Sequence, residues 1–557
     1  MVTWDPPAGG QWELETVHVQ GWLPQMFQER APEAFKIGFQ RVGERYGLPV
    51  DYLDIRFVNA HCYARMRVLG APEPKRGKPS SAPPTWVLKV LSRVHPALRR
   101  RARAARAALA ERRWHADLDR WTSGLRDEML ATGRALQAEP IDQLADVELI
   151  DHVRRVADHF VRGTMLHFEL VPVHNIPVGR FVIACREWEI TDGDGLALLA
   201  GSSPASASSA AGLARVAAAC AAQGVDPGTL EDIRAAGPDA SAALDAYLAD
   251  HAWRAVTQYT PRGRTLIEMP HVLVQAIRSA GRRSVDDVAE REGPPDPAEL
   301  RARVPAAYQA RFDELLDDAR RCYGNRDDNV ALTFMWPVGL LRRAILEVGR
   351  RLVDRGVLDD PAHALALGER ELAAALHGDA ALGDEARARV AQMEMWETEG
   401  APLQLGDSEG PPPDLSAFPA AMAEVTNAMM TLFELEGFAQ AGGRAEWTGE
   451  GVGIGTQPYI GRACVATSPD EALRQLHPGD VLVTTMTTPA FESIMPIAGA
   501  VVTEQGGLVS HTALVAREHG IPAVVGVTGA TAAIPHGSLL EVDPVHGRVT
   551  ISAAVPG

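Results

Sequence analysis

The sequence predicts a multidomain protein in which a mostly α-helical N-terminal substrate domain precedes a C-terminal α/β domain. Two observations support this fold class. Between Trp86 and Gly400, apolar residues recur at the three- and four-residue spacing of helices, as in residues 340–353. After residue 445, short runs of Val, Ile and Leu alternate with turns, as strands do. A chain of 557 residues is also long enough for several cores of ordinary size.

The composition is that of a globular protein and excludes several classes of function. Hydrophobic residues make up 46% and charged residues 23% of the chain, which argues against disorder as the main state. The net charge of −17 argues against a nucleic-acid partner, because phosphate neutralisation requires a basic surface. Five widely spaced cysteines without a Cys-x-x-Cys pair indicate neither a disulfide framework nor a metal site.

Targeting signals are not evident either. The N-terminus has no basic region followed by an apolar core, and no apolar run approaches the length of a membrane span. We therefore expect a cytoplasmic protein with no membrane partner.

Three regions follow one another along the chain. Residues 1–400 are expected to form the substrate-binding domain, residues 401–445 a linker with a connecting helix, and residues 446–557 a mobile domain. The linker begins with a Gly- and Pro-rich stretch from Ala401 to Leu415, which predicts a semi-rigid arm on which the last domain swings.

One helix of the first region is unusually basic. Residues 99–113 are rich in Arg and Ala, which is compatible with a helix that binds anions or a partner. A solvated arginine face beside acidic neighbours is the favoured interpretation.

The C-terminal domain is predicted to contain short strands joined by turns and a few helices. The expected strands are Val481 to Thr484, Gly499 to Thr503, Ala523 to Val525, Leu539 to Val542 and Val549 to Ile551.

His511 is the most informative residue of this domain. Ser510 is a good N-cap, and residues 511–519 read as a short helix that ends at Gly520. His511 would stand on the first turn, where unpaired N–H groups and the helix dipole favour a phosphoryl group. A largely neutral imidazole can attack phosphorus and later release it. A histidine that merely begins a surface helix is the alternative, and the surrounding motif favours the phosphoryl carrier.

The region from about Gly451 to Ile551 resembles the mobile phosphohistidine domain of the phosphoenolpyruvate-utilising enzymes. The resemblance rests on the histidine motif and on several shorter ones, namely Pro478 to Val483, Thr488-Pro489, Ala500 to Glu504, Gly537, Val542-Asp543 and Gly547. Residues 455–461 depart from the family's usual Ala-Ser-Pro-Gly stretch.

This resemblance implies a swivelling β/β/α fold in which His511 is phosphorylated during turnover. Gly506, Gly507, Ser510 and Thr512 would then cradle the phosphoryl group.

Three short motifs stand out in the N-terminal 400 residues, namely Trp12 to Glu15 with His18, Arg45 to Pro49, and Gly349 to Leu352 with Asp354 to Leu358. Through these motifs this part of the chain resembles the substrate domain of rifampin phosphotransferase and the large subunit of phenylphosphate synthase. Neither an ATP-grasp domain nor a TIM barrel is recognisable. The resemblance thus implies that ATP and Mg²⁺ act through a separate ATP-grasp subunit, and that this chain binds no cofactor tightly.

An acceptor hydroxyl must lose its proton as it attacks phosphorus, so a base or a cation is expected near it. His167 and His174 lie in a mostly apolar stretch and are the candidates for the substrate site, with His18 a weaker one. Buried structural histidines are an equal alternative for the first two.

Three functions remain in view. The favoured one is the substrate-binding and phosphohistidine subunit of an ATP-dependent phosphotransferase that acts on a small organic hydroxyl, with phenolic compounds preferred. An antibiotic-type substrate is the second, and a phosphocarrier or regulatory module without a small substrate is the third.

Overall fold

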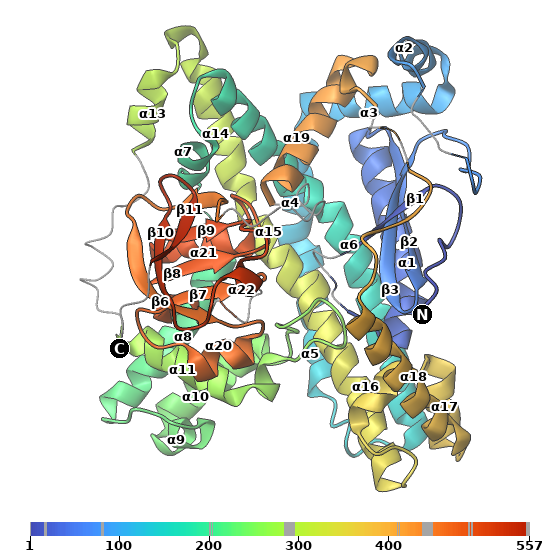
Figure 1. The fold of residues 1–557 in the computed structure, drawn as a ribbon, viewed down its shortest axis with the longest axis vertical. Coiled ribbons are helices and arrows are strands. Elements are labelled where there is room, and N and C mark those ends of the chain that lie inside the picture. Colours follow the sequence, from blue (N-terminus) through green and yellow to red (C-terminus); the bar gives the residue numbers. More distant parts are fainter. Residues whose placement is uncertain are drawn as a thin grey trace. The chain divides into compact units, whose positions relative to one another are not determined.

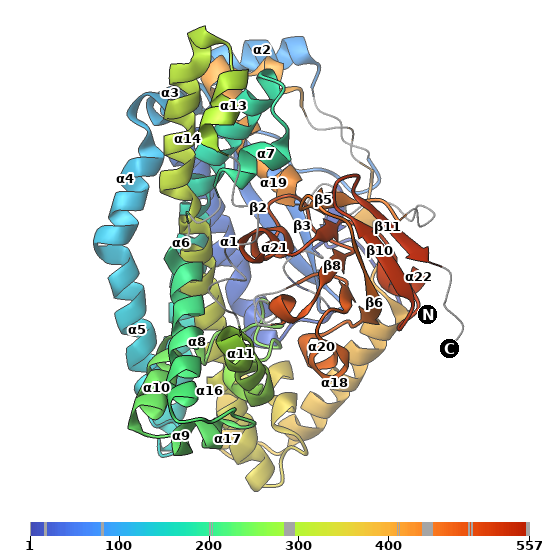
Figure 2. The ribbon, with the colours of Figure 1, turned by 90° about the vertical axis from the view of Figure 1, so that its left-hand side faces the viewer.

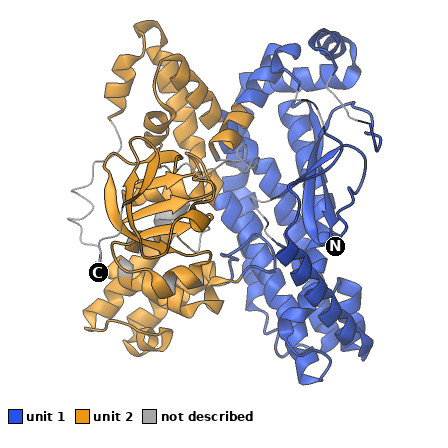
Figure 3. Cartoon of the chain, in the orientation of Figure 1, with its two compact units in different colours: residues 1–176, 253–263, 328–427 blue, residues 177–252, 264–327, 428–557 orange. Residues whose placement is uncertain are grey.

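The computed structural model of the chain describes most of its residues and divides into two compact units (Figure 3). The described residues are 2–15, 19, 21–78, 83–199, 202, 204–282, 296–408, 410, 413–436, 449–487, 491 and 494–552. Unit 1 comprises residues 1–176, 253–263 and 328–427, and unit 2 comprises residues 177–252, 264–327 and 428–557. Each unit is therefore assembled from segments that are distant in the sequence.

Unit 1 contains a four-stranded antiparallel sheet that the sequence analysis did not anticipate. Its strands are β1 (Gln11–Leu14), β2 (Val50–Val58), β3 (His61–Val68) and β4 (Gln404–Gly406), in the order β2-β3-β1-β4. Asn59 and Ala60 both have positive φ, which suits the tight turn between β2 and β3. The N-terminal part is still mostly helical, as predicted, but a sheet lies within it.

The strand β4 falls inside the segment that was expected to be a free arm. Leu405 pairs with Trp12 of β1 and is buried with Tyr63. The Tyr63 hydroxyl also donates a hydrogen bond to the Pro402 carbonyl, at 2.8 Å. The first part of the predicted swinging arm is thus a strand of unit 1, because its apolar side chain completes a small core there.

Helices form the rest of unit 1. Helix α1 packs along β2, and its Gly38 allows close approach to α6, because an added Cβ would lie 2.9 Å from the Phe168 side chain. The helices are α1 (Gln25–Tyr46), α2 (Thr85–Val94), α3 (Pro96–Glu111), α4 (Arg113–Arg120), α5 (Arg126–Ala138), the first part of α6 (Asp146–Glu187), α16 (Trp336–Asp354), α17 (Glu369–Leu376), α18 (Ala381–Glu399) and the first part of α19 (Ala420–Glu436) (Figure 1).

Two short π-helical segments interrupt this helical region. They are η1 (Trp121–Leu125) and η4 (Val330–Met335). Asp328, just before η4, accepts hydrogen bonds from the Trp121 indole and the Arg126 guanidinium, both at 2.8 Å. Such segments often mark functional sites, because they displace side chains from the regular helical positions.

Unit 2 combines a second helical region with the C-terminal sheet. Its helices before the sheet include the end of α6, α7 (Asp192–Ala197), α8 (Pro204–Ala222), α9 (Leu230–Ala235), α10 (Pro238–His251), α11 (Pro270–Arg282), α13 (Pro297–Arg303), α14 (Gln309–Tyr323), the start of α15 (Asn325–Asn329) and the end of α19. Phe181, Phe312 and Leu435 are among the buried residues that join α6, α14 and α19 in one core.

The C-terminal sheet has seven strands in the order β11-β10-β6-β7-β8-β9-β5, with β6 to β9 parallel. The strands are β5 (Val452–Ile454), β6 (Tyr459–Val465), β7 (Val481–Thr484), β8 (Ala500–Thr503), β9 (Ala523–Val525), β10 (Leu539–Asp543) and β11 (Arg548–Ser552). The helices α20 (Pro469–Gln475), α21 (His511–His519) and α22 (Ala530–Ala533) accompany them (Figure 2). All five strands predicted here are confirmed, with boundaries within one residue.

The parallel strands β7, β8 and β9 are buried at every position, which explains their continuous apolar runs. Among the described helices, none has the length and apolar character needed to cross a bilayer.

Candidate functional site

His511 is the first residue of helix α21, as predicted. The Ser510 hydroxyl caps the helix by accepting a hydrogen bond from the Ala513 N–H, at 3.4 Å. Gly520 ends the helix in the left-handed conformation, with φ of 58°. Gly506 has φ of 120°, and an added Cβ would lie 2.9 Å from the Ser510 hydroxyl oxygen. A glycine is required at this position because a side chain would displace the cap.

Two buried threonines hold the imidazole from one side. The Thr487 hydroxyl lies 3.1 Å from Nδ1 of His511 and 2.8 Å from the Thr512 hydroxyl. Both threonines are almost completely buried. Nδ1 is therefore occupied by a hydrogen bond, and Nε2 is the ring nitrogen on the other side. The Thr512 hydroxyl thus bonds to the same threonine that bonds the ring, and its predicted contact with a phosphoryl group stays a prediction.

The surroundings keep this imidazole neutral. Burial lowers the pKa of His511 to about 4, while the charge of Asp327 raises this pKa and that of Arg326 lowers it, both to a smaller extent. A neutral imidazole has a free lone pair, so the side chain is nucleophilic at pH 7. The charges of Arg326 and Asp327, which belong to unit 2 as His511 does, thus act on the histidine.

The segment before His511 is bound to the helices of unit 2. The Val509 N–H donates to the Leu435 carbonyl at 3.1 Å, and the Arg326 guanidinium donates to the Val509 carbonyl. Val509 is buried in the core of α6, α14 and α19, and Leu508 and Leu514 pack against it. The Arg517 guanidinium donates to the Leu508 carbonyl. These contacts fix the start of α21 beside α15.

The predicted substrate residues and His511 belong to different parts of the chain's fold. His167 and His174 are on the part of α6 that belongs to unit 1, and His18 lies outside the described residues. The His167 ring is 5.5 Å from that of Phe334 in η4, and its carbonyl accepts a hydrogen bond from Asn329 at 3.0 Å. Tyr259 also contacts Phe334, with ring centroids 6.2 Å apart. His167 thus belongs to an aromatic cluster, whereas His174 is a buried residue of the helix.

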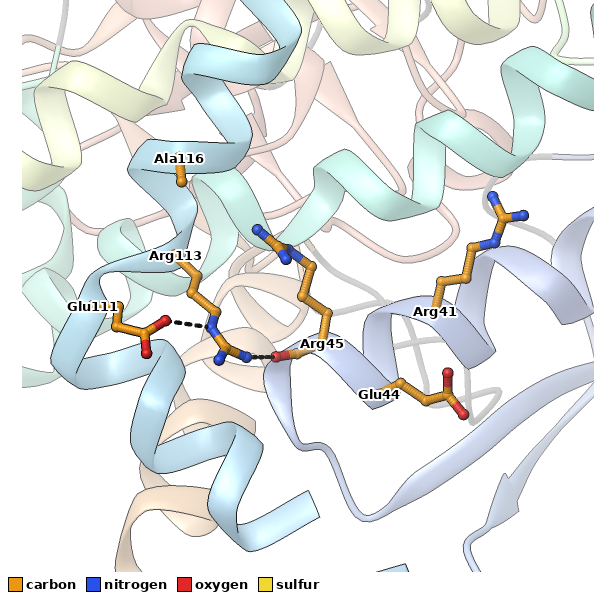
Figure 4. Close-up of a pocket in the computed structure, with 6 residues that line it drawn as sticks. All are labelled: Arg41, Glu44, Arg45, Glu111, Arg113 and Ala116. Atoms are coloured by element: carbon orange, nitrogen blue, oxygen red, sulfur yellow. Dashed lines mark hydrogen bonds and ion pairs between the residues drawn. The ribbon is translucent and has the colours of Figure 1, made fainter. Parts of the chain in front are cut away.

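A surface pocket of 510 Å³ in unit 1 contains none of these residues. It is lined by Arg41, Glu44, Arg45, Glu111, Arg113 and Ala116 (Figure 4). Arg113 donates to Glu111 at 3.0 Å and to the Arg45 carbonyl at 2.8 Å. Arg45 also pairs with the buried carboxylate of Asp117, at 2.6 Å. These arginines are occupied by the protein's own acceptors, so we do not assign the pocket a role.

Sequence reasoning missed Thr487, Arg326 and Asp327. Thr487 directly precedes the Thr488-Pro489 pair, which was the available signal, although that pair lies outside the described residues. Arg326 and Asp327 belong to a polar run, residues 325–329, that directly precedes the apolar stretch 330–341. Among the residues that the structure describes, no group of three or more His, Cys, Asp or Glu side chains could hold a metal ion.

Comparisons with known proteins match two parts of the chain. Residues 476–547, which include His511, match the family described as the mobile domain of PEP-utilising enzymes. Residues 203–345, which include Arg326 and Asp327, match the fourth domain of rifampicin phosphotransferase. The two matched regions thus contain both sides of the contact between the histidine segment and α15.

Curated relatives give the same indication. The chain is 31% identical over 218 residues to the uncharacterised phosphotransferase YvkC of Bacillus subtilis, which is 37% of this chain and 23% of that protein. It is 45% identical over 103 residues to phosphoenolpyruvate synthase of Aeropyrum pernix, or 18% of this chain and 13% of the relative. It is 32% identical over 214 residues to the uncharacterised protein Rv2047c of Mycobacterium tuberculosis, which is 38% of this chain and 22% of that protein. The chain spans less than a quarter of each of these relatives.

Proposed function

We propose, on the premise that this chain belongs to the phosphoenolpyruvate-utilising enzymes, that it is a phosphotransferase whose His511 carries a phosphoryl group to a small organic hydroxyl. The observation that carries the proposal is the environment of His511. Its neutral ring stands at a helix start, with Nδ1 held by Thr487 at 3.1 Å and with Arg326 and Asp327 nearby.

The first step uses Nε2 as the nucleophile. Its lone pair forms a P–N bond while the P–O bond of the donor breaks, and the Nδ1 hydrogen bond to Thr487 keeps the ring oriented as positive charge develops. The N–H groups of the first turn of α21 favour the transferred anion. Gly506, Gly507 and Ser510 are proposed to shape the backbone around it, with Thr512 supporting Thr487.

The second step transfers the phosphoryl group to the acceptor. The acceptor oxygen forms a P–O bond as the P–N bond breaks, and its proton must go to a base. Asp327 is the carboxylate that interacts with His511, and we assign it this role. Arg326 would balance the charge of the phosphoryl oxygens.

A phenolic acceptor and an ATP donor complete the proposal. The preference for a phenolic acceptor rests on the likeness of short N-terminal motifs to phenylphosphate synthase, and His167 and His174 of unit 1 stay candidates for contact with it. ATP and Mg²⁺ would act on a separate ATP-grasp subunit that charges His511. The match of residues 203–345 to rifampicin phosphotransferase supports an antibiotic-type hydroxyl as the second candidate.

The test is chemical phosphorylation of the full chain with phosphoramidate, a small phosphoryl donor that requires no partner. We expect acid-labile, alkali-stable label on His511 in the wild type and its loss in His511→Ala. His519→Ala, at the other end of the same helix, is the matched control and should retain the label. Acid-stable label on Ser510 or Thr512, or equal labelling of His511→Ala, would refute the carrier role. Discharge of the label to phenol and to a rifamycin then separates the two acceptors.

A further inference from the structure

The part of the chain between Glu73 and Glu111 differs in charge from the rest of the protein. Residues 74–110 contain ten Lys and Arg residues and no Asp or Glu, whereas the whole chain has a net charge of −17. This basic segment includes helices α2 and α3, which pack against each other within unit 1 (Figure 1). It contains none of the residues assigned to phosphoryl transfer.

Helix α2 presents a row of apolar side chains to solvent. Trp86, Val90 and Val94 follow one another at four-residue spacing and are 70%, 50% and 60% exposed. We call these three residues the apolar stripe. The opposite side of the helix is anchored, since Leu88 and Ser92 are buried and the Ser92 hydroxyl contacts the Ala417 carbonyl at 3.4 Å. The stripe is therefore held outward by the packing of the helix and is not a consequence of fraying.

Exposed basic side chains lie on both α2 and α3. Lys89 and Arg93 are exposed along one edge of α2, a position that follows from their spacing relative to Val90 and Val94. On α3, Arg99, Arg103 and Arg106 repeat at helical spacing and are exposed, whereas Leu98, Ala102 and Ala105 are buried. Within the described residues, Arg99 and Arg103 form no ion pair, so their charge is available to a partner.

We propose that α2 and α3 form a peripheral docking surface for an anionic phospholipid bilayer. An exposed helix with Trp and aliphatic residues on one face and Lys and Arg beside it is suited to lie in the headgroup region of a membrane. Clusters of four to eight basic residues next to such a helix attract anionic lipids.

A bilayer explains the pattern better than an acidic protein does. The apolar stripe stands on one outward-facing helix, and the charges are spread over two helices instead of being grouped for defined ion pairs. Both features suit a fluid, uniformly anionic surface. The proposal differs from the expectation of no membrane partner, which rested on the lack of a targeting signal and of an apolar run long enough to span a bilayer. It does not depend on the phosphotransferase assignment.

The experiment is co-sedimentation of the full chain with vesicles of phosphatidylcholine alone or mixed with phosphatidylglycerol, at low and high salt. We expect binding only to the mixed vesicles and its loss at high salt. Arg99→Glu combined with Arg103→Glu should lower the partition constant at least about tenfold, since each basic residue near the surface contributes about 1 kcal/mol. Trp86→Ser combined with Val90→Ser should also weaken binding, because it removes most of the apolar stripe.

Matched variants at other exposed positions of unit 1 serve as controls. Arg370→Glu and Met395→Ser change an exposed Arg and an exposed apolar residue outside the basic segment and should bind as the wild type does. Thermal unfolding identifies variants that have lost their fold. No binding to mixed vesicles, equal binding to both vesicle types, or equal losses in the control variants would overturn the proposal. Equally tight binding to soluble polyglutamate, independent of Trp86, would overturn it in favour of an acidic protein partner.

Discussion

Replacing Thr487 by Val tests whether the contact at Nδ1 prepares His511 for phosphorylation. The substitution keeps the shape of the side chain but removes the hydroxyl that lies 3.1 Å from Nδ1. It also leaves the Thr512 hydroxyl, 2% exposed, without its 2.8 Å partner. The reactive ring would lose its orienting bond, and a buried polar group would lose its hydrogen bond.

The magnitude follows from these two contacts. A hydrogen bond to the imidazole contributes about 1 to 1.5 kcal/mol, so its loss should slow phosphorylation of His511 about tenfold. The unsatisfied Thr512 hydroxyl should lower the free energy of unfolding by about 1 to 3 kcal/mol. The ring would also be free to rotate, and some label should move from Nε2 to Nδ1.

The assay is the rate of labelling by phosphoramidate, with ³¹P NMR to distinguish the two phosphohistidine isomers. Thr484→Val is the matched control, because Thr484 is a fully buried threonine of the same domain whose hydroxyl has no hydrogen-bond partner in the described part of the chain. It should label at the wild-type rate and be at least as stable. Wild-type rate and isomer in Thr487→Val, or an equal loss in Thr484→Val, would refute the orienting role.

Three further predictions concern pH, the sheet of unit 1 and the nucleotide. Burial lowers the pKa of His159 to about 4, so the unfolded chain takes up the proton first and stability falls as pH drops from 6.5 towards 4. In urea unfolding, the free energy of unfolding of His159→Leu should therefore fall by about 2 kcal/mol less than that of the wild type between pH 7 and pH 5. Equal falls in the two proteins would contradict this. Leu405→Asp should destabilise unit 1 by at least about 3 kcal/mol, because Leu405 is buried against Trp12 and Tyr63, whereas the exposed neighbour Leu403→Asp should cost little. Calorimetry of the isolated chain should detect no tight ATP binding, and micromolar affinity would contradict the separate nucleotide subunit.

Features formed by residues close together in the sequence were predicted, and features formed by residues far apart in the sequence were not. Helix α21 was predicted with its cap and its end because Ser510, His511 and Gly520 are neighbours in the chain. The C-terminal strands were predicted because each is a short apolar run between turns. The sheet of unit 1 was missed because β1 pairs with β4, which brings Trp12 against Leu405, 393 residues later in the chain. Such pairing leaves no local pattern.

The candidate site was likewise predicted only where its residues are close together in the sequence. His511 stands in a recognisable motif, but Thr487 is 24 residues away and reaches it only through the packing of the domain. Arg326 is far more distant in sequence and is connected by its bond to the Val509 carbonyl. The motif therefore identifies His511 as the candidate, whereas its contacts with Thr487 and with the segment bound by Arg326 become visible only in three dimensions.

The backbone N–H of Val509 offers a way to observe the position of the histidine segment. Its N–H is bonded to the carbonyl of Leu435, in the last turn of α19, where helix carbonyls lack partners of their own. When this hydrogen bond breaks, water can bind both the N–H and the carbonyl group. Its loss therefore costs only about 1 kcal/mol of free energy. The proposed carrier role requires this bond to break, and the buried Val509 side chain to leave its core, each time the segment moves. Hydrogen exchange at the Val509 amide should accordingly quicken whenever the histidine departs, which gives a readout of carrier movement that needs neither donor nor acceptor.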